Sequence, residues 1–323
     1  MDDPSRVAEA RRLAFTIARE EGLDQAGISS AELVATEMAT NLLKHAKNGE
    51  IHIARLSTQG SQGVDFLSID KGPGIVSIEE CLRDGYSGTG TSGTGLGAIR
   101  RISRTFDAYS EMGKGSVMLA RISPPAEAGM TVGWAGRPIS GEDVSGDSWA
   151  LRQEGETSLF IVADGLGHGI QAAEASAEAI SAFRTSSDTN PSQLVQRVHR
   201  ALRGTRGAAV AVASLDRNKR VVRYAGIGNI AGYVVSPAKT QFMISHNGTA
   251  GHEATHFQEF LYPFPEASLL IMHSDGLSTS WNLGAYPGLQ MRHPGVIAGI
   301  LYRDASRSRD DVCVVVAKDC AWP

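Results

Sequence analysis

The stretch GYSGTGTSGTGLG, from Gly85 to Gly97, decides how the first part of this chain is interpreted. Six of its thirteen residues are glycine, which permits positive φ angles and lets another group approach the backbone closely. Consecutive N–H groups in such a loop can form a concave nest for anions. The next residues, AIRRISRTF, predict a helix whose N-terminus directs partial positive charge at the loop. The stretch therefore predicts a phosphate cradle, with a mobile glycine-serine linker as the alternative.

Two common phosphate-binding motifs do not fit this stretch. Gly88, Gly90 and Gly93 spell G-x-G-x-x-G, but the dinucleotide-binding form requires a strand directly before it. The preceding residues, SIEECLRDG, predict a short helix instead. A P-loop would end in Gly-Lys-Ser/Thr, and this stretch contains no lysine.

Two further motifs precede the glycine-rich stretch. A capping box at residues 29–32 (SSAE) predicts the start of a helix. On that helix Glu37 and Asn41 lie one turn apart on the same face, which suits a general base beside a metal ligand, although the face could simply be solvated. Asp70 ends a predicted strand and begins the sequence DKGPG, which fits either a turn or a buried acceptor for a ligand amino group.

These motifs, Glu37-x-x-x-Asn41, Asp70-x-Gly72-x-Gly74 and the glycine loop, resemble in order the three boxes of the GHKL ATPase family, over residues 5–122. Within that family the spacing is most similar to RsbT-like serine/threonine switch kinases of bacterial partner-switching modules and the stressosome. The resemblance implies an α/β sandwich of the GHKL (Bergerat) type that binds ATP with Mg²⁺. It also implies that Asn41 ligates the Mg²⁺, that Asp70 receives the adenine amino group, and that Glu37 is the catalytic base. The cofactor-binding residues so implied are Asn41, Asp70, Gly72, Gly74, Gly93, Thr94, Gly95, Leu96 and Gly97.

A short proline-containing segment, SPPAEAG at residues 123–129, predicts a linker. We therefore expect an ATP-binding domain at residues 1–123, a linker at 124–131 and a second domain at 132–323. In the second domain Asp147, Asp164, Asp275 and Asp310 each stand beside a strand-like run. Singly each fits a cap or a turn, but four together suit a cluster of oxygen ligands for Mg²⁺ or Mn²⁺.

The ordered segments SGDS, ADGLGHG with AAEAS, HSDG and RDDVCVVV resemble the bacterial metal-dependent protein phosphatases of the SpoIIE and RsbX type, over residues 131–318. The resemblance implies a PPM-type sandwich of two antiparallel sheets covered by helices, with two Mn²⁺ or Mg²⁺ ions at the sheet edge. Asp164 would be the catalytic residue that bridges both ions and Gly165 would lend its carbonyl. The metal ligands so implied are Asp147, Asp164, Gly165, Asp275 and Asp310. Leu151 stands where an aspartate is commoner, and no arginine is recognisable as a phosphate clamp.

Composition narrows the classes of protein further. The 323 residues suffice for two domains, and a formal net charge of −4 predicts no nucleic-acid partner. The three cysteines form no C-x-x-C pair and predict reduced thiols. The sequence starts without a signal peptide and has no run long enough for a membrane span, so we expect a cytoplasmic protein with no membrane partner.

Together these patterns predict an α/β (α+β) protein of two domains that joins an ATP-dependent serine/threonine kinase to a metal-dependent phosphoserine/phosphothreonine phosphatase. The expected partners are phosphorylatable STAS-domain regulators, with a sigma factor or a downstream switch protein as further options and a homodimer as an open arrangement. In one alternative the first domain is an anti-sigma-like binding module gated by nucleotide. In another it is a degenerate nucleotide sensor beside an active phosphatase.

Overall fold

The computed structural model describes residues 3–56, 62–82, 95–124 and 130–319, and it separates into two compact units. The first unit contains residues 1–128 together with Leu283–Arg303, and the second contains residues 129–282 and 304–321. Most of the expected linker lies outside the described residues, so its bounds remain a prediction. One segment differs from the expected division, because Leu283–Arg303 packs with the first unit although it lies within the predicted second domain.

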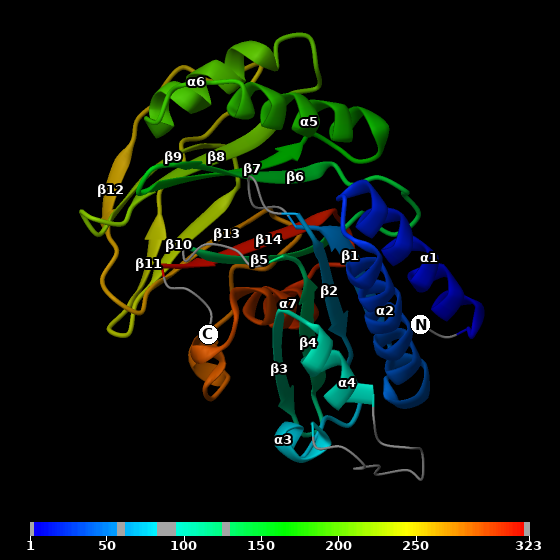
Figure 1. The fold of residues 1–323 in the computed structure, drawn as a ribbon. Helices are drawn as coiled ribbons and strands as arrows, with labels where there is room; N and C mark the ends of the chain where they lie inside the picture. The colour runs from blue at the N-terminus through cyan, green and yellow to red at the C-terminus, as the bar shows by residue number, and fades with distance from the viewer. Residues whose placement is uncertain (1–2, 57–61, 83–94, 125–129, 320–323) are drawn as a thin grey trace. The chain divides into compact units, whose positions relative to one another are not determined.

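The first unit has a four-stranded antiparallel sheet in the order β1-β2-β4-β3. Figure 1 shows the two long helices α1 and α2 beside each other along this sheet. The predicted helices of this part are present, although the one predicted at residues 98–106 ends at Ile102 because Thr105 begins a strand. Their bounds are α1 Ser5–Glu20, α2 Gln25–His45, β1 Glu50–Arg55, β2 Val64–Ile69, α3 Ile78–Cys81, α4 Gly95–Ile102, β3 Thr105–Glu111 and β4 Gly115–Ile122.

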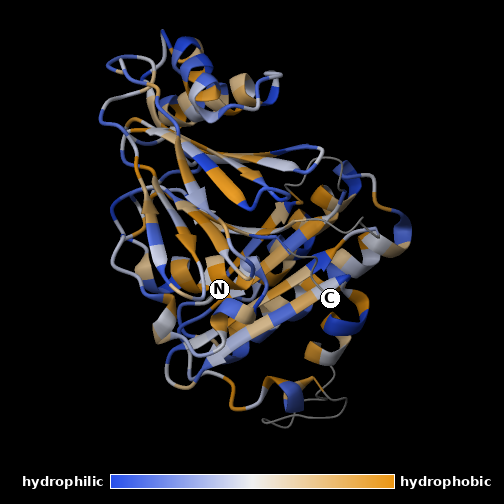
Figure 2. Ribbon diagram, turned by 90° about the vertical axis from the view of Figure 1, so that its left-hand side faces the viewer, coloured by the Kyte–Doolittle hydropathy of each residue, from blue (hydrophilic) through white to orange (hydrophobic). Residues whose placement is uncertain are grey.

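Small residues bring α1 and α2 close together. Ala14 and Ala18 of α1 and Ala31 and Ala35 of α2 are all buried in one core that also contains Phe66 of the sheet. Figure 2 shows apolar residues along many strands and on faces of several helices. The amphipathic pattern of the sequence therefore specifies which helix faces pack on the sheet.

The start of α2 corrects one expectation. The helix begins at Gln25, one turn before the predicted capping box, and Asp24 is its N-cap. The Asp24 carboxylate accepts a hydrogen bond of 2.7 Å from the Gly27 N–H. Aspartate and serine are about equally good N-cap residues. Because Asp24 is the cap, the helix begins before Ser29 and Ser30, and both serines lie inside it.

Helix α7 (Pro294–Ala305) completes the first unit from a distant part of the chain. All residues from Pro294 to Arg303 are buried, as is usual for a helix that is apolar on all sides. The buried carboxylate of Asp107 on β3 holds the approach to this helix, because it accepts hydrogen bonds from the His293 N–H at 2.7 Å and from Arg292 at 3.2 Å. The pKa of Asp107 is raised, chiefly by burial.

The second unit has two five-stranded antiparallel sheets, in the orders β11-β10-β13-β14-β5 and β12-β9-β8-β7-β6. This is the predicted sandwich. The strands are β5 Thr131–Arg137, β6 Asp147–Glu154, β7 Thr157–Gly165, β8 Ala208–Asp216, β9 Val221–Ile227, β10 Ala231–Val235, β11 Thr240–Met243, β12 Phe260–Pro263, β13 Leu269–His273 and β14 Val312–Lys318. The helices are α5 Ile170–Arg184 and α6 Pro191–Ala201, with short 3-10 turns at Leu283–Ala285 and Leu289–Met291 in the segment that packs with the first unit.

Alternation along β7 separates two cores. Leu159, Ile161 and Ala163 pack in a core with α5 and α6, whereas Phe160 and Val162 pack in a core with the other sheet. Figure 1 shows α5 and α6 lying over the sheet that contains β6 to β9. Because side chains alternate along a strand, this parity places Asp164 on the face that looks toward the other sheet.

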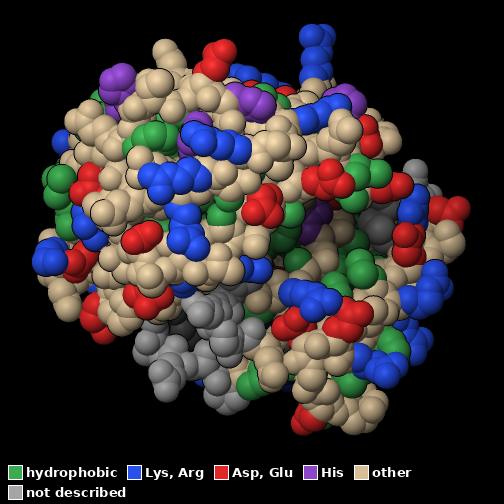
Figure 3. Space-filling model, turned by 90° about the horizontal axis from the view of Figure 1, so that it is seen from above, with side chains coloured by type: hydrophobic (Ala, Val, Ile, Leu, Met, Phe, Trp, Pro, Cys, Tyr) green, Lys and Arg blue, Asp and Glu red, His purple; other side chains and the backbone are tan. Residues whose placement is uncertain are grey.

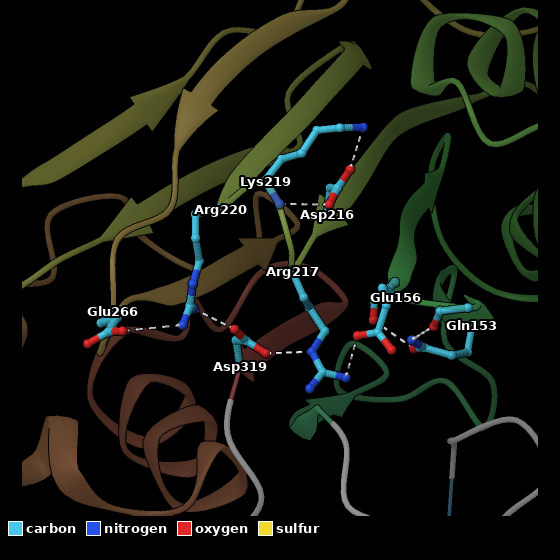
Figure 4. Close-up of polar contacts among 10 residues, drawn as sticks. Gln153, Glu156, Asp216, Arg217, Lys219, Arg220, Glu266 and Asp319 are labelled. Carbon is cyan, nitrogen blue, oxygen red and sulfur yellow. Dashed lines mark hydrogen bonds and ion pairs between the residues drawn. The ribbon is translucent and has the colours of Figure 1, made fainter.

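Ion pairs join the two sheets of the second unit. Asp319, which follows β14, pairs with Arg217 at 2.7 Å and also with Arg220, both from the turn between β8 and β9. Figure 4 shows the two arginines converging on this carboxylate, with Glu266 and Glu156 at their outer sides. The Asp319 side chain is only 9% exposed, so this network fixes the turn against the end of β14.

The surface and the helices agree with the composition. Acidic and basic side chains are interspersed over the face drawn in Figure 3, as a chain with 31 Lys and Arg and 35 Asp and Glu predicts. Within the described ranges, no helix combines the length and the apolar character needed to cross a membrane.

The packing of α7 gives the first prediction. In Gly299→Ala the new Cβ would lie 2.6 Å from Cγ1 of Val117, too close without movement of β4. Helix propensity alone favours alanine by about 1 kcal/mol, whereas overpacking costs about 1–3 kcal/mol. We therefore expect Gly299→Ala to lower the free energy of unfolding measured by urea denaturation. Gly295→Ala, whose Cβ would lie 3.1 Å from Leu119, should cost less, and a stabilised Gly299→Ala protein would contradict the packing.

Candidate active sites

Two of the predicted metal ligands face each other across neighbouring strands. Asp147 at the start of β6 is the direct register partner of Asp164 near the end of β7. Residues in this relation have Cβ atoms about 4.5–5.5 Å apart, and like charges directly opposite each other destabilise a sheet. Strand pairing therefore forces two carboxylates together at this edge.

Two further predicted ligands join them from the other sheet. Asp275 follows β13 and Asp310 precedes the adjacent strand β14. Burial raises the pKa of Asp275, and the nearby carboxylate of Asp310 raises it further. Asp164 is in turn influenced by the charges of Asp147, Asp275 and Asp310. The structure thus brings together all four aspartates that the sequence singled out.

The cluster has the electrostatics of a cation site. Burial is the main cause that raises the pKa of Asp147 and of Asp164, and the neighbouring carboxylates raise both further. Oδ1 of Asp147 and Oδ1 of Asp275 are buried without a hydrogen-bond partner. Oxygen-only donors of this kind fit Mg²⁺ or Mn²⁺. In the side-chain positions of the described residues, however, no three His, Cys, Asp or Glu groups converge as ligands of a single ion.

Glycines allow the backbone to close around the cluster. A Cβ on Gly165 would lie 2.1 Å from the Ala172 carbonyl oxygen, and one on Gly276 would lie 1.8 Å from that of Asp311. A Cβ on Gly146 would meet both Ala172 and the Asp311 carboxylate at 2.8 Å. These positions exclude any side chain, which explains why a glycine accompanies three of the acidic motifs.

Several positioning groups were not recognised in the sequence. Ser274 is fully buried and donates a hydrogen bond of 2.6 Å to Oδ2 of Asp147, while its hydroxyl accepts from the Cys313 N–H at 3.0 Å. Asn229 donates to Oδ2 of Asp275 at 2.6 Å. Only Ser274 had a local signal, since it stands within the HSDG motif.

Asp311 has a structural role beside its neighbour Asp310. Its two carboxylate oxygens accept hydrogen bonds from the Ile139 N–H at 2.8 Å and the Gly146 N–H at 3.0 Å. Both oxygens are therefore used to hold the segment that leads into β6. This leaves Asp310 as the member of the pair available to a cation.

In the first unit, α2 presents Glu37 and Asn41 to the start of α4. A Cβ on Gly95, the first residue of α4, would lie 2.6 Å from Oε2 of Glu37 and 4.0 Å from Nδ2 of Asn41. The glycine is thus needed for the helix start to approach these two side chains. The predicted base, the predicted Mg²⁺ ligand and the end of the glycine loop lie together.

Asp70 is held by backbone groups where β2 ends. Its carboxylate accepts hydrogen bonds from the Gly72 N–H at 2.6 Å and the Ser116 N–H at 3.2 Å, and burial raises its pKa. Gly74 has a φ of +80°, and a Cβ there would lie 2.4 Å from the Glu111 carbonyl oxygen. The motif therefore forms a rigid turn whose carboxylate has a fixed direction.

The remaining part of the nucleotide motif is only partly described. Gly95, Leu96 and Gly97 form the first turn of α4, and Gly97 is buried. Gly93 and Thr94 lie outside the described residues, as does the rest of the stretch from Gly85. The phosphate cradle thus remains a prediction.

The chain matches two family models in the expected order. Residues 154–318 match the family described as stage II sporulation protein E (SpoIIE). The chain belongs to the SpoIIE family. Residues 1–121 of this SpoIIE-family protein match a histidine kinase-like ATPase domain.

Curated relatives repeat this division. Serine/threonine-protein kinase RsbT of Bacillus subtilis (strain 168) is 33% identical over 117 residues, which cover 35% of this chain and 86% of RsbT. Phosphoserine phosphatase RsbX of the same organism is 24% identical over 139 residues, which cover 43% of this chain and 70% of RsbX.

A solved structure from work on "the bacterial stressosome: a modular system that has been adapted to control secondary messenger signaling" has a TM-score of 0.55 and 29% identity. It covers 58% of this chain and 99% of its own length. The SpoIIE-family chain therefore combines a kinase-like ATPase domain with a PPM-type serine/threonine phosphatase domain.

The hydrogen bonds of Ser274 give the second prediction. Ser274→Ala removes the donor to Asp147 and leaves the Cys313 N–H without this acceptor, so Asp147 loses its fixed orientation. Groups that orient metal ligands typically contribute about 10–100-fold to metal affinity, so calorimetry should show at least tenfold weaker Mn²⁺ binding. The matched control is Ser148→Ala, whose hydroxyl bonds Ser176 rather than a carboxylate. Equal affinities in the two variants would remove Ser274 from this role.

Proposed function

We propose that this protein is a bifunctional enzyme of a bacterial partner-switching system, with an ATP-dependent serine/threonine kinase in its first unit and a metal-dependent phosphoserine/phosphothreonine phosphatase in its second. The observation that carries the proposal is the opposed pair Asp147 and Asp164 with its buried, unpartnered carboxylate oxygen. A bound cation would relieve the repulsion between these carboxylates and would supply the partner that the buried oxygen lacks. The chain's RsbX-like and RsbT-like halves support the assignment of each activity.

In the phosphatase, the chain's own residues would build and orient the acidic pocket. Asp164 would bridge two cations, with Asp147, Asp275, Asp310 and the Gly165 carbonyl as further ligands. Two Mn²⁺ or Mg²⁺ ions, when bound, would neutralise phosphate charge and activate water for in-line attack on phosphorus. Ser274 and Asn229 would fix the directions of two ligand carboxylates through the hydrogen bonds described above.

In the kinase, Asp70 would accept the adenine amino group while its remaining hydrogen bonds keep it fixed in the turn. Asn41 would ligate Mg²⁺ on the phosphates of ATP, and Gly93, Gly95 and Gly97 would surround them. Glu37 would accept the proton of a serine or threonine hydroxyl on a protein substrate. Positioning and charge neutralisation dominate such phosphoryl transfer.

We infer that the substrates are STAS-domain regulators in the cytoplasm, phosphorylated by the first unit and dephosphorylated by the second. The relatives RsbT and RsbX, a serine/threonine-protein kinase and a phosphoserine phosphatase, support a phosphorylatable protein partner. The direct test is to incubate the chain with labelled ATP and a STAS-domain protein and to follow label onto the protein and then off it. Label that never appears on any such protein would favour a nucleotide-gated binding module.

The phosphatase assignment predicts strict metal dependence. Chelation should abolish hydrolysis of a phosphoserine protein, and added Mn²⁺ should restore it. Asp164→Asn should lower the rate by roughly 10²-fold or more, since even groups outside the ligand shell of a metal contribute 10–100-fold. Asp216→Asn, which alters a β8 aspartate that bonds Lys219, is the control and should keep the parental rate. Activity that survives exhaustive chelation would rule out the two-metal assignment.

The kinase assignment predicts different losses at two carboxylates. Asp70→Asn should weaken ATP binding, measured by calorimetry, by roughly 10-fold or more because a charged acceptor is lost. Glu37→Ala should retain ATP binding but slow phosphoryl transfer about 10²–10⁴-fold, the usual contribution of a general base. Glu32→Ala, on the same helix but paired with Arg11, is the matched control. If Glu37→Ala transferred phosphate at the control's rate, Glu37 would not be the base.

A further inference from the structure

A pocket is formed around the loop that follows β7. It has a volume of about 450 Å³ and is lined by Glu142, His168, Ile170, Gln171 and Arg206 and by two glycines of the loop between β7 and α5. We call it the loop pocket. The strand β7 ends with Asp164 and Gly165 and leads directly into this loop, so the pocket and the cluster share one continuous piece of backbone.

Strand register places Arg206 beside this loop. Gly165 is the register partner of Ala208, and the Leu166 N–H donates a hydrogen bond of 3.0 Å to the Gly207 carbonyl. Arg206, the next residue outward, reaches over the loop, since a Cβ on Gly167 would lie 3.0 Å from its Nη1. The Arg206 guanidinium therefore lies beside Gly167, which is three residues after the predicted bridging ligand Asp164.

The charges in the loop pocket leave this arginine available. Glu142 is engaged by His168, with Oε1 and Nδ1 2.7 Å apart, and a Cβ on Gly169 would lie 3.0 Å from Oε2. In the part of the chain that the structure describes, the exposed Arg206 side chain makes no ion pair and no hydrogen bond. The planar guanidinium is the side chain best suited to bind a phosphate or carboxylate through two parallel hydrogen bonds.

Apolar side chains border the same pocket. Ile170 is 69% exposed and lines the pocket, and Leu166 at the other end of the loop is 44% exposed. Apolar side chains beside a free guanidinium suit a peptide segment rather than a small inorganic ion alone.

We propose that the loop pocket binds the phosphorylated segment of the protein substrate and that Arg206 is its anion-binding residue. This inference rests on the proposed phosphatase function. The anion is either the phosphoryl group itself or an acidic side chain next to the phosphoserine. Arg206 would thus supply the phosphate-binding arginine that sequence reasoning did not find.

The test compares Arg206→Gln with Arg203→Gln in the full chain loaded with Mn²⁺. Arg203 is an exposed arginine three residues away that does not line the pocket, so both variants lose the same charge on the same segment. The substrates are para-nitrophenyl phosphate and two phosphoserine peptides, one flanked by acidic residues and one by alanines. Hydrolysis gives KM and kcat, and fluorescence anisotropy gives peptide affinity without turnover.

We expect Arg206→Gln to weaken binding of the acidic peptide, and to raise its KM, by about tenfold or more, with Arg203→Gln close to parental. If Arg206 holds the phosphoryl group, all three substrates lose kcat/KM; if it holds a flanking carboxylate, only the acidic peptide does. Arg206→Lys should recover part of the loss.

The outcomes separate this inference from the phosphatase assignment. Equal behaviour of Arg206→Gln and Arg203→Gln on all substrates and in binding overturns the loop pocket and leaves the phosphatase intact. A parental protein that binds the peptide through Arg206 but hydrolyses nothing supports the pocket and overturns the phosphatase. If the parental protein neither binds nor hydrolyses the peptides, both the loop pocket and the phosphatase assignment are overturned.

Discussion

Repulsion between two carboxylates held in register is the constraint on which the second unit depends. Asp147 and Asp164 cannot separate without breaking the ladder between β6 and β7, which continues through β8 and β9. Burial intensifies the repulsion, because an uncompensated buried charge is costly. Neighbouring groups hold this pair in place. Ser274 donates a hydrogen bond to the Asp147 carboxylate, and Asp311 accepts one from the Gly146 N–H just before β6. The sandwich is therefore a rigid frame that holds carboxyl groups close together, and either protons or a bound cation can neutralise their charge.

In the first unit, backbone groups position the side chains of the predicted nucleotide site. Asp70 is fixed by two N–H donors from the turn and from β4, and Gly95 brings a helix start against Glu37. Both features require glycine at positions where any Cβ would collide with its neighbours. At these positions the glycines allow the backbone to approach closely, while the Asp70 carboxylate is held in a fixed direction.

Features that depend on local motifs or on periodic patterns could be predicted from the sequence. The sandwich was implied by the resemblance to the SpoIIE-type and RsbX-type phosphatases, and the four aspartates could be grouped because each stands beside a strand-like run. The start of α2 was misplaced because Asp24 and the box at residues 29–32 are both acceptable caps, and the helix begins at the first of them. Ser274 and Asn229 bind carboxylates that lie 127 and 46 positions away in the sequence, in relations that no spacing rule encodes. The loop at residues 85–94 has a strong sequence signal and lies outside the described residues.

The helix α7 also affects the order in which the chain can mature on the ribosome. The first unit contains residues 1–128 and Leu283–Arg303, so 154 residues of other structure are synthesised between its two parts. At the usual 5–20 residues per second this interval lasts roughly 10–30 s. During that time Val117, Leu119 and Leu67 of the sheet lack the helix that later packs on them. Nascent chains of this protein thus expose an apolar sheet face for many seconds, and a gene product that ended before α7 would expose it permanently.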